Sequence, residues 1–189
     1  MTFDDLPLAA ALKDSLRARK LVQPTPVQRD AIPPALQSKD VLACAQTGSG
    51  KTAAFVLPIL QRLIEDPGAA PERAMRNLVL VPTRELAVQV AEVFGQLGAS
   101  EGIMVQCVYG GVSQRRQVHG LSAGPEVVVA TPGRLLDLMA QRHVDLSQVE
   151  CLVLDEVDRM LDMGFVRDVR KIVAALPAKR QNLAFSATL

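Results

Sequence analysis

The chain alternates between short apolar runs and longer segments in which apolar residues recur with helical spacing. The short runs have the length of strands, and near-continuous apolar strands that alternate with helices are typical of a parallel sheet covered on both faces. We therefore predict an α/β fold with an open, mainly parallel sheet. The predicted strands are 41–45, 78–81, 103–108, 126–130, 152–154 and 183–185, with helices to about residues 65 and 97, over 135–141, and to about residue 175. The segment 66–76, which contains two prolines and one glycine without periodicity, is predicted to be an exposed, mobile loop.

The first forty residues are predicted to contain two helices. Apolar residues recur every four positions from Leu8 to Leu16, which gives one apolar stripe on a helix. Further on, Thr25 is a good N-cap, Pro26 suits the first helical position, and Gln28 falls three residues after the cap. This Thr-x-x-Gln capping box is sufficient to explain Gln28 without any functional role.

The segment 41–52 carries the strongest chemical signal. A predicted strand runs into a Gly-rich turn and then into a Lys-Thr helix start, an arrangement that cradles phosphates with backbone N–H groups. Lys51 is expected to reach the β- and γ-phosphates, and the Thr52 hydroxyl to bind Mg²⁺. Ala45 stands where this pattern usually has glycine, and we interpret it as the end of the strand. A chance Gly-Lys-Thr in a turn is the alternative. The predicted nucleotide-binding residues here are Gln46, Thr47, Gly48, Ser49, Gly50, Lys51 and Thr52.

Polar segments follow the other predicted strands as well. Because ligands bind outside the carboxyl ends of the strands in an open parallel sheet, these segments are expected to share one edge. Thr83 and Thr131 could instead be helix caps, and Arg84 and Arg134 could simply be solvated. The segments are 82–85, 131–134, 155–158 and 186–188.

The strand 152–154 ends in two acidic residues, Asp155 and Glu156. Burying an unpaired carboxylate costs several kcal/mol, so a cation is the expected partner. Beside a phosphate-binding loop, Asp155 is placed to hold Mg²⁺ partly through water, and Glu156 to orient or deprotonate an attacking water. Asp158 can return across one helical turn. The alternative is that these acids only stabilise a helix N-terminus.

Composition and charge narrow the picture further. The 189 residues carry a formal net charge of +1, so no global basic field exists to attract nucleic acid. Three cysteines, Cys44, Cys107 and Cys151, lie far apart in predicted buried runs, which predicts reduced core thiols in a cytoplasmic protein. No apolar run reaches the roughly 20 residues of a membrane span, and the start lacks the features of a signal peptide.

Together these motifs resemble the DEAD-box family of ATP-dependent RNA helicases, along the chain from Phe3 to Leu189. The resemblance implies a RecA-like P-loop NTPase fold, a three-layer sandwich. It also implies that Gln28 reads the adenine edge and that Phe3 helps to hold the base. The matching pieces are 24–28, 45–52, 82–87, 110–111, 131–134, 155–158 and 186–188.

The resemblance also assigns roles to the remaining polar segments. It implies that Asp158 couples to Ser186 and Thr188, linking the nucleotide site to strand separation. It implies a track for the RNA backbone that does not read sequence. Three positions depart from the family pattern: Lys20, usually glycine; Leu21, often aromatic; and Val157, usually alanine. The predicted RNA-binding residues are Pro82, Thr83, Arg84, Gly110, Gly111, Thr131, Gly133 and Arg134.

The domain organisation expected from the resemblance is one RecA-like ATP-binding domain over 1–189. It would comprise N-terminal helices with the adenine motif (1–38) and the P-loop core (39–189). The family's second RecA-like domain, which supplies arginines to the γ-phosphate, has no counterpart here, so we expect the chain alone to be nearly inactive. The rival classes are a DNA helicase or translocase and a non-catalytic binding module whose binding depends on nucleotide.

Overall fold

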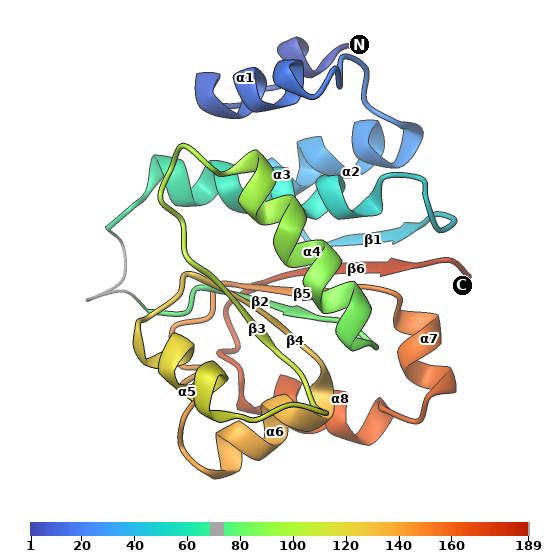
Figure 1. Ribbon diagram of the computed structural model, residues 1–189. Helices are drawn as coiled ribbons and strands as arrows, with labels where there is room; N and C mark the ends of the chain where they lie inside the picture. The colour runs from blue at the N-terminus through green and yellow to red at the C-terminus, as the bar shows by residue number, and fades with distance from the viewer. Residues whose placement is uncertain (69–73, 189) are drawn as a thin grey trace.

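The computed structural model describes residues 1–68 and 74–188 and contains one six-stranded parallel sheet in the order β1-β6-β5-β2-β4-β3 (Figure 1). The strands are β1 (Val41–Cys44), β2 (Asn77–Leu80), β3 (Val105–Val108), β4 (Val127–Ala130), β5 (Cys151–Leu154) and β6 (Gln181–Ser186). The helices are η1 (Phe3–Asp5), α1 (Ala10–Ala18), α2 (Pro26–Leu36), α3 (Lys51–Glu65), α4 (Arg84–Leu97), α5 (Arg115–Ser122), α6 (Pro132–Ala140), α7 (Val157–Asp162) and α8 (Val166–Ala175).

The predicted α/β class with a parallel sheet and helices on both faces is confirmed, and the result is consistent with a RecA-like fold. All six strands lie within two residues of their predicted bounds at each end. The largest total difference is in β6, which begins two residues early, at Gln181, and ends one residue late, at Ser186. Two predictions were incomplete: α6 begins at Pro132, three residues earlier than expected, and α5 was not predicted. The α5 sequence is mostly polar, so periodicity gave little signal there.

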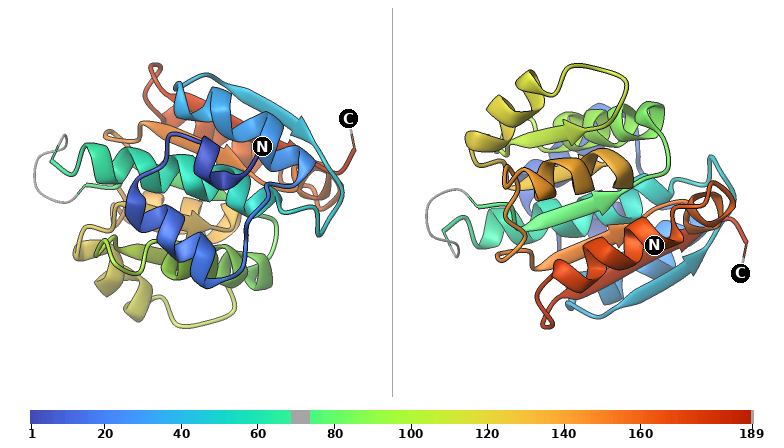
Figure 2. Two further views of the ribbon diagram at one scale, coloured as in Figure 1. Left: turned by 90° about the horizontal axis from the view of Figure 1, so that it is seen from above. Right: turned by 90° about the horizontal axis from the view of Figure 1, so that it is seen from below.

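The sheet has a separate hydrophobic core on each face. Successive side chains of a strand point to opposite faces, and β2 shows this clearly: Val79 packs in one cluster, and Leu78 and Leu80 pack in the other. The first cluster includes side chains from α1 to α4, and the second includes side chains from α5 to α8. Figure 2 shows the two layers from above and below. Both faces are therefore sealed over the central strands.

The N-terminal helices pack onto the first of these layers. Leu8, Leu12 and Leu16, the predicted apolar stripe, are all buried in the cluster that contains α3 and α4. The backbone N–H of Ala9 donates a hydrogen bond of 2.6 Å to Oε1 of Gln61 on α3. Residues 1–38 thus share a core with the sheet. The division of the chain into 1–38 and 39–189 stays a prediction.

Lys20 ends α1 in a conformation that favours glycine. Its φ of 58° lies in the left-handed region. The Lys20 N–H donates to the Arg17 carbonyl (2.9 Å) and the Leu21 N–H to the Leu16 carbonyl (3.0 Å), the hydrogen-bond pattern of a Schellman C-cap. The left-handed turn explains why glycine suits this position, from which Lys20 departs.

Replacing Lys20 with glycine is expected to stabilise the fold. A non-glycine residue in the left-handed region costs roughly 1 kcal/mol, so Lys20→Gly should raise the free energy of unfolding by about that amount. Chemical denaturation monitored by circular dichroism would measure it. Lys20→Ala is the matched control, since it removes the same charge and keeps the strain; an equal gain in both variants would contradict the backbone explanation.

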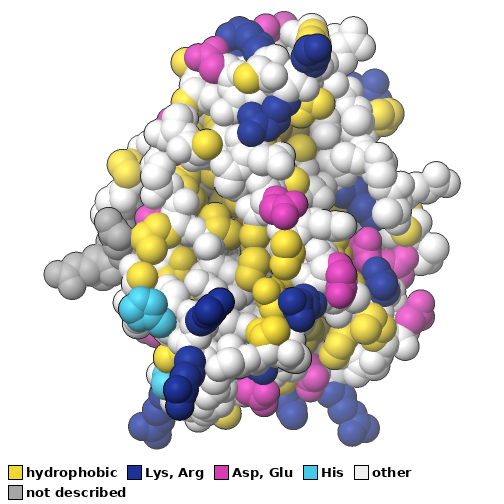
Figure 3. All heavy atoms as spheres, viewed as in Figure 1, with side chains coloured by type: hydrophobic (Ala, Val, Ile, Leu, Met, Phe, Trp, Pro, Cys, Tyr) yellow, Lys and Arg dark blue, Asp and Glu magenta, His cyan; other side chains and the backbone are white. Residues whose placement is uncertain are grey.

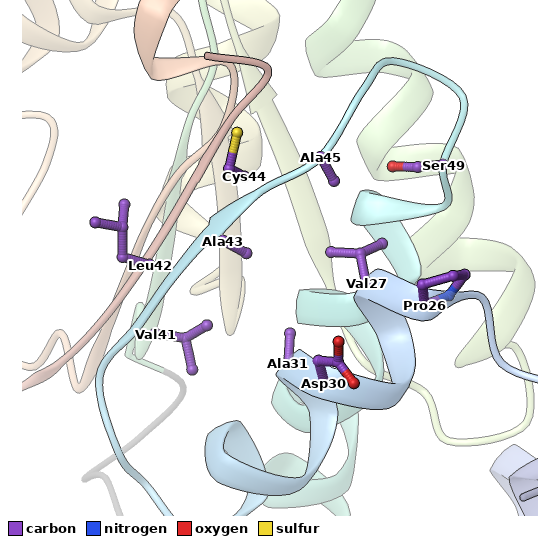
Figure 4. Close-up of a pocket in the computed structure, with 10 residues that line it drawn as sticks. All are labelled: Pro26, Val27, Asp30, Ala31, Val41, Leu42, Ala43, Cys44, Ala45 and Ser49. Carbon is purple, nitrogen blue, oxygen red and sulfur yellow. The ribbon is translucent and has the colours of Figure 1, made fainter. Parts of the chain in front are cut away.

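β1 lies at an edge of the sheet, and this corrects one prediction about burial. Leu42 is 69% exposed and Cys44 is exposed, because both point to the face of β1 that no described helix covers. Figure 4 shows Val41 and Ala43 pointing toward α2, with Leu42 and Cys44 on the other side. The prediction that Cys44 is a core thiol was therefore wrong, whereas Cys151 is buried and Cys107 is partly so.

Arg76 corrects the predicted bounds of the exposed loop 66–76, part of which lies outside the described residues. Its side chain is buried and forms an ion pair of 2.8 Å with Glu150, the residue before β5. Its Nη1 also donates to the Asp66 carbonyl at 2.6 Å. Arg76 therefore belongs to the amino-terminal edge of the sheet. Among the described residues, no helix is long and apolar enough to cross a membrane.

Candidate nucleotide and RNA sites

The predicted site segments all follow strands, so the strand order decides which of them meet. β1, β6 and β5 are neighbours. They lead into the loop 45–50, called the phosphate loop below, into the segment 186–188 and into the acidic segment 155–158. β2, β4 and β3 are also neighbours, and they lead into 82–84, 131–134 and 109–111. The carboxyl edge is therefore divided into a half with the predicted nucleotide groups and a half with the predicted RNA groups.

The phosphate loop requires two glycines by its backbone geometry. Gly48 and Gly50 have φ values of 81° and 89°, and α3 begins directly afterwards at Lys51. A Cβ on Gly50 would lie 2.5 Å from Nε2 of Gln28, so a larger residue there would displace the Gln28 amide from the loop. The loop thus ends at a helix N-terminus, where anions are favoured.

Gln28 connects α2 to this loop. It is buried, its Oε1 accepts a hydrogen bond of 2.9 Å from the Thr25 N–H, and its Nε2 donates one of 3.0 Å to the Gly50 carbonyl. The capping prediction for Gln28 is confirmed in this half of the box. The Gln28 amide can cap α2 and also read an adenine edge, because it has a second N–H and a second lone pair that these two bonds do not use.

Phe3 is placed less favourably for contact with a base. Its side chain is only 4% exposed and packs in the cluster with Leu6 and Leu8. Its backbone N–H donates to the Val22 carbonyl at 3.1 Å, which fixes the start of the chain against the middle of the α1–α2 connection. The adenine contact of Phe3 stays a prediction.

Lys51 and Asp155, which lie a hundred positions apart in the sequence, are electrostatic neighbours. Lys51 is 7% exposed and Asp155 is 2% exposed. Burial raises the pKa of the Asp155 carboxyl to about 6, while the Lys51 charge and a 2.9 Å hydrogen bond from the Glu156 N–H act to lower it. Within the described part of the chain, the Lys51 ammonium has no hydrogen-bond partner. A buried, unpaired cation beside a buried carboxylate is suited to a ligand that carries both phosphates and a metal ion.

Glu156 begins α7 in a strained conformation. Its φ of 51° is left-handed, which costs a non-glycine residue on the order of 1 kcal/mol. Its carboxylate is 3.2 Å from a guanidinium nitrogen of Arg159. Val157, the departure from the family pattern, is part-buried and packs against the cluster of α6 and α8.

Asp158 contacts the segment after β6. The Thr188 hydroxyl donates a hydrogen bond of 3.2 Å to Asp158 Oδ2. Burial acts to raise the pKa of Asp158, but hydrogen bonds from the Arg159 N–H and from the Thr188 and Ser186 side chains outweigh it, so the net pKa is lowered. The Ser186 carbonyl in turn accepts from the Ala45 N–H at 2.9 Å, beside the phosphate loop. These contacts connect the acidic segment 155–158, through the end of β6 and the residues after it, to the start of the phosphate loop.

The donor set for a metal ion is small but chemically suitable. The part of the structure that is described contains no group of three or more His, Cys, Asp or Glu residues able to hold a metal. Magnesium does not need such a group, because it keeps several waters and is usually held by one or two protein oxygens together with substrate phosphates. Asp155, a buried carboxylate for which the described residues provide no ion pair, and the Thr52 hydroxyl at the start of α3 fit that pattern.

The phosphate loop also borders a surface groove. A groove of about 360 Å³ lies between α2 and β1 and is lined in part by Val27, Ala31 and Ser49 (Figure 4). Ser49 has a buried hydroxyl that, among the described residues, lacks a hydrogen-bond partner. A polar hydroxyl is therefore available at the loop.

The candidate RNA half of the edge carries two arginines at helix starts. Arg84 is exposed at the first position of α4, and its Cζ lies 5.1 Å from the centre of the Tyr109 ring. Arg134 is on the first turn of α6 and donates to the Val112 carbonyl at 3.1 Å. Thr83 caps α4 by accepting from the Leu86 N–H at 3.3 Å, whereas the Thr131 hydroxyl makes no capping bond. Pro82 is buried beside Thr83.

Glycines on this half are not all explained by the fold. Gly111 has a left-handed φ of 79°, but Gly110 and Gly133 do not. A Cβ on any of the three would meet nothing within 4 Å. The fold therefore leaves open space above the three glycines, where a backbone ligand could approach closely. Figure 3 shows acidic, basic and apolar side chains interspersed on one face, in keeping with a local and not a global basic site.

Comparison with known proteins identifies the class. The fold and site define an α/β protein with a glycine-rich strand-to-helix loop and a paired acidic segment on one sheet edge. The family description "DEAD/DEAH box helicase" matches residues 25–189, and the chain belongs to this family.

Three relatives illustrate the similarity. The DEAD-box ATP-dependent RNA helicase CshA of Streptococcus pneumoniae (strain TIGR4) is 45% identical over 189 residues, which are 100% of this chain and 35% of that protein. ATP-dependent RNA helicase DeaD of Escherichia coli K12 is 48% identical over 100% of this chain and 29% of its own length. The human "Probable ATP-dependent RNA helicase DDX49" is 49% identical over 191 residues, which cover 99% of this chain and 38% of that protein. The chain thus spans about a third of the length of such relatives.

Sequence reasoning missed two residues at the candidate RNA half, Tyr109 and Gln117. Tyr109 stacks against Arg84, and Gln117 on α5 is buried with hydrogen bonds to Tyr109 and Arg134. The only signal in the sequence was the position of Tyr109 directly before two glycines. Gln117 lies on the helix that was not predicted, so no pattern pointed to it.

Proposed function

We propose that this chain is the N-terminal, ATP-binding half of an ATP-dependent RNA helicase core. The observation that carries the proposal is that one sheet edge holds a buried Lys51 without a hydrogen-bond partner among the described residues, beside Asp155, and, after the neighbouring strands β2 and β4, a pair of arginines next to open glycines. One site would bind a nucleotide and the other a phosphodiester backbone. The family membership and the names of the relatives support the same assignment.

In the proposed nucleotide site each residue has a defined task. The backbone N–H groups of 46–50 hold the phosphates at the N-terminus of α3, and the Lys51 ammonium pairs with the β- and γ-oxygens. Gln28 reads the adenine edge, with Phe3 nearby in the same N-terminal unit. Glu156 orients or deprotonates the attacking water. Thr52 and Asp155 would hold Mg²⁺, which when bound neutralises charge that builds up on the phosphates.

In the proposed RNA site the contacts are to the backbone and do not read bases. Thr83, Arg84, Thr131 and Arg134 offer hydroxyls and guanidinium groups, and the glycines 110, 111 and 133 allow close approach of the strand. Asp158 would transmit the state of the nucleotide site through Ser186 and Thr188. Duplex unwinding, or remodelling of RNA–protein complexes, would follow from that coupling.

We further propose that activity needs more of the protein than this chain contains. The relatives are about three times as long, and a second RecA-like domain would supply the missing arginines. An arginine finger contributes about 10³–10⁵ in rate to phosphoryl transfer. The chain alone is therefore expected to bind nucleotide with little hydrolysis and no unwinding. A cytoplasmic location is proposed from the expectation of reduced cysteines.

The RNA assignment is tested by replacing the two arginines singly. Arg84→Ala and Arg134→Ala should each weaken binding of single-stranded RNA several-fold and lower the slope of log affinity against log salt by about 0.7, because each removes one phosphate contact. Fluorescence anisotropy with labelled oligouridylate and a mixed-sequence strand would measure both. Arg167→Ala, on the exposed side of α8, is the matched control. Losses that depend on RNA sequence, or a preference for the matched DNA strand, would contradict the proposal.

A further inference from the structure

Gln117 is a buried polar residue whose side-chain hydrogen bonds, among the described residues, reach Tyr109 and Arg134 at the candidate RNA surface. It lies on α5 and is 5% exposed. Its Oε1 accepts from the Tyr109 N–H at 3.2 Å, and its Nε2 donates to the Tyr109 carbonyl at 2.9 Å. One amide thus pairs with both main-chain groups of the residue that follows β3, in the way that a neighbouring strand would. Gln117 therefore fixes the main chain at the start of the Gly110–Gly111 turn.

The same amide reaches Arg134. Nη1 of Arg134 lies 3.5 Å from Gln117 Oε1, at the long end of hydrogen-bonding distance, and Nη2 donates to the Val112 carbonyl at 3.1 Å. Arg134 is thus held directly by Gln117. It is also held through the segment 109–112, whose path Gln117 sets. Because the guanidinium has five N–H donors, these two contacts leave others free to face a phosphate.

Arg84 is connected to the same point through an aromatic ring. Its guanidinium carbon lies 5.1 Å from the centre of the Tyr109 ring, a cation–π arrangement. Whatever fixes the main chain of Tyr109 also fixes the direction in which its ring leaves the chain. The orientation of Arg84 therefore depends, through Tyr109, on Gln117.

We propose that Gln117 is the positioning residue of the RNA surface, and that it sets Arg84, Arg134 and the Gly110–Gly111 turn at the spacing of a single-stranded phosphodiester backbone. This inference rests on the proposed function. Gln117 does not touch the RNA, because it is buried beneath these segments. Because Gln117 already restricts the orientations of the two arginines in the free protein, less conformational entropy is lost when RNA binds.

A general packing role for Gln117 makes different predictions. A side chain that only fills space would be replaceable by an apolar residue of similar length, and its loss would act equally whether or not Arg134 is present. A positioning residue acts in part through Arg134, so the loss it causes should be smaller when Arg134 has been removed, and the two substitutions should not be fully additive. The experiment below separates these cases.

The first test is Gln117→Met in the whole 189-residue chain, alone and together with Arg134→Ala. Methionine keeps the length of the side chain and removes its amide. We expect about fivefold weaker binding of fluorescein-labelled oligouridylate when Arg134 is present, and less than about twofold when it is absent. Gln114→Met is the matched control: Gln114 precedes the same helix but bonds to Gln141, at 2.8 Å, so RNA affinity should not change.

The second test is Gln117→Glu, which keeps the shape and also serves if the methionine variant fails to fold. A carboxylate at this position would pair with Arg134 and withdraw its charge from RNA. We expect several-fold weaker binding and a salt slope lower by about 0.7, as if Arg134 had been removed. An unchanged salt slope would show that the side chain at position 117 does not reach Arg134. Affinity for ADP should be unaltered in all variants, because the phosphate loop follows the strand at the opposite edge of the sheet.

The outcomes separate the positioning role of Gln117 from the RNA site on which it rests. Wild-type RNA affinity in Gln117→Met, an equal loss with and without Arg134, or an unchanged salt slope in Gln117→Glu would overturn the positioning role and leave the proposed function standing. Absence of RNA binding by the parent chain, or of any effect of Arg84→Ala and Arg134→Ala, would instead overturn the RNA site itself.

Discussion

Lys51→Ala is expected to weaken the binding of adenine nucleotides about a hundredfold. The Lys51 ammonium is buried, has no hydrogen-bond partner within the described residues, and begins the helix that follows the phosphate loop. Charge-assisted hydrogen bonds to phosphate oxygens contribute about 1.5–3 kcal/mol, which corresponds to about 10–100-fold in affinity, and more than one such bond is lost here. Isothermal titration calorimetry with ADP and Mg²⁺ measures this directly.

The parent chain provides the selectivity test for the same site. Because Gln28 holds the phosphate loop through the Gly50 carbonyl and has free amide groups for adenine, ADP should bind and GTP should not. Lys171→Ala, on the exposed surface of α8, is the control for loss of a lysine charge. Equal binding of GTP and ADP would rule out base reading by Gln28, and unchanged ADP affinity in Lys51→Ala would rule out the phosphate site.

Asp155→Asn is expected to stabilise the free chain at pH 7 by up to about 3 kcal/mol while removing the Mg²⁺ dependence of nucleotide affinity. Burial raises the pKa of Asp155 from 3.8 to about 6, so the folded state must hold a carboxylate that would be more favourably ionised when unfolded. A pKa difference of this size corresponds to roughly 3 kcal/mol. Asparagine resembles the protonated form and avoids this cost.

The direction of the pH dependence follows from the same shift. Between pH 4 and 6 the folded state of the parent binds more protons at Asp155 than the unfolded state does, so this group makes the parent less stable as pH rises. The difference in unfolding free energy between Asp155→Asn and the parent should be near zero at pH 4, grow through pH 6, and then level off. Urea denaturation at each pH measures it, with the exposed Asp137→Asn as control.

Asp155→Asn is also expected to abolish the dependence of nucleotide affinity on Mg²⁺. Nucleotide affinity in the parent should fall when EDTA replaces Mg²⁺, whereas the variant should bind equally with and without the metal. A variant that is no more stable than the parent at pH 7 would show that the carboxylate is already compensated. A variant that retains full Mg²⁺ dependence would place the metal on other oxygens.

Much of the candidate site was predictable because its chemistry is local in sequence. Gly48, Gly50, Lys51 and Thr52 lie in one short segment, in which the two glycines take left-handed φ values and the lysine and threonine begin α3. The acidic pair after β5 was equally visible, since an apolar strand that ends in two carboxylates needs a cation. The helix starts at Thr25 and Thr83 followed from capping residues.

Other features depended on which neighbours the fold supplies. The exposure of Leu42 and Cys44 follows from the place of β1 at the edge of the sheet, which the apolar sequence of the strand does not reveal. The burial of Arg76 depends on Glu150, which lies 74 positions away. The role of Lys20 as a left-handed helix end became visible only in its backbone angle.

The sequence by itself determined the class of fold, the order of its elements and the turn that cradles phosphates, because hydrophobic period and turn chemistry act over a few residues. Only the tertiary structure decided that the predicted nucleotide and RNA groups occupy separate halves of one edge, and that Gln117 contacts Arg134. These relations are set by the order of strands in the sheet, which no local pattern encodes.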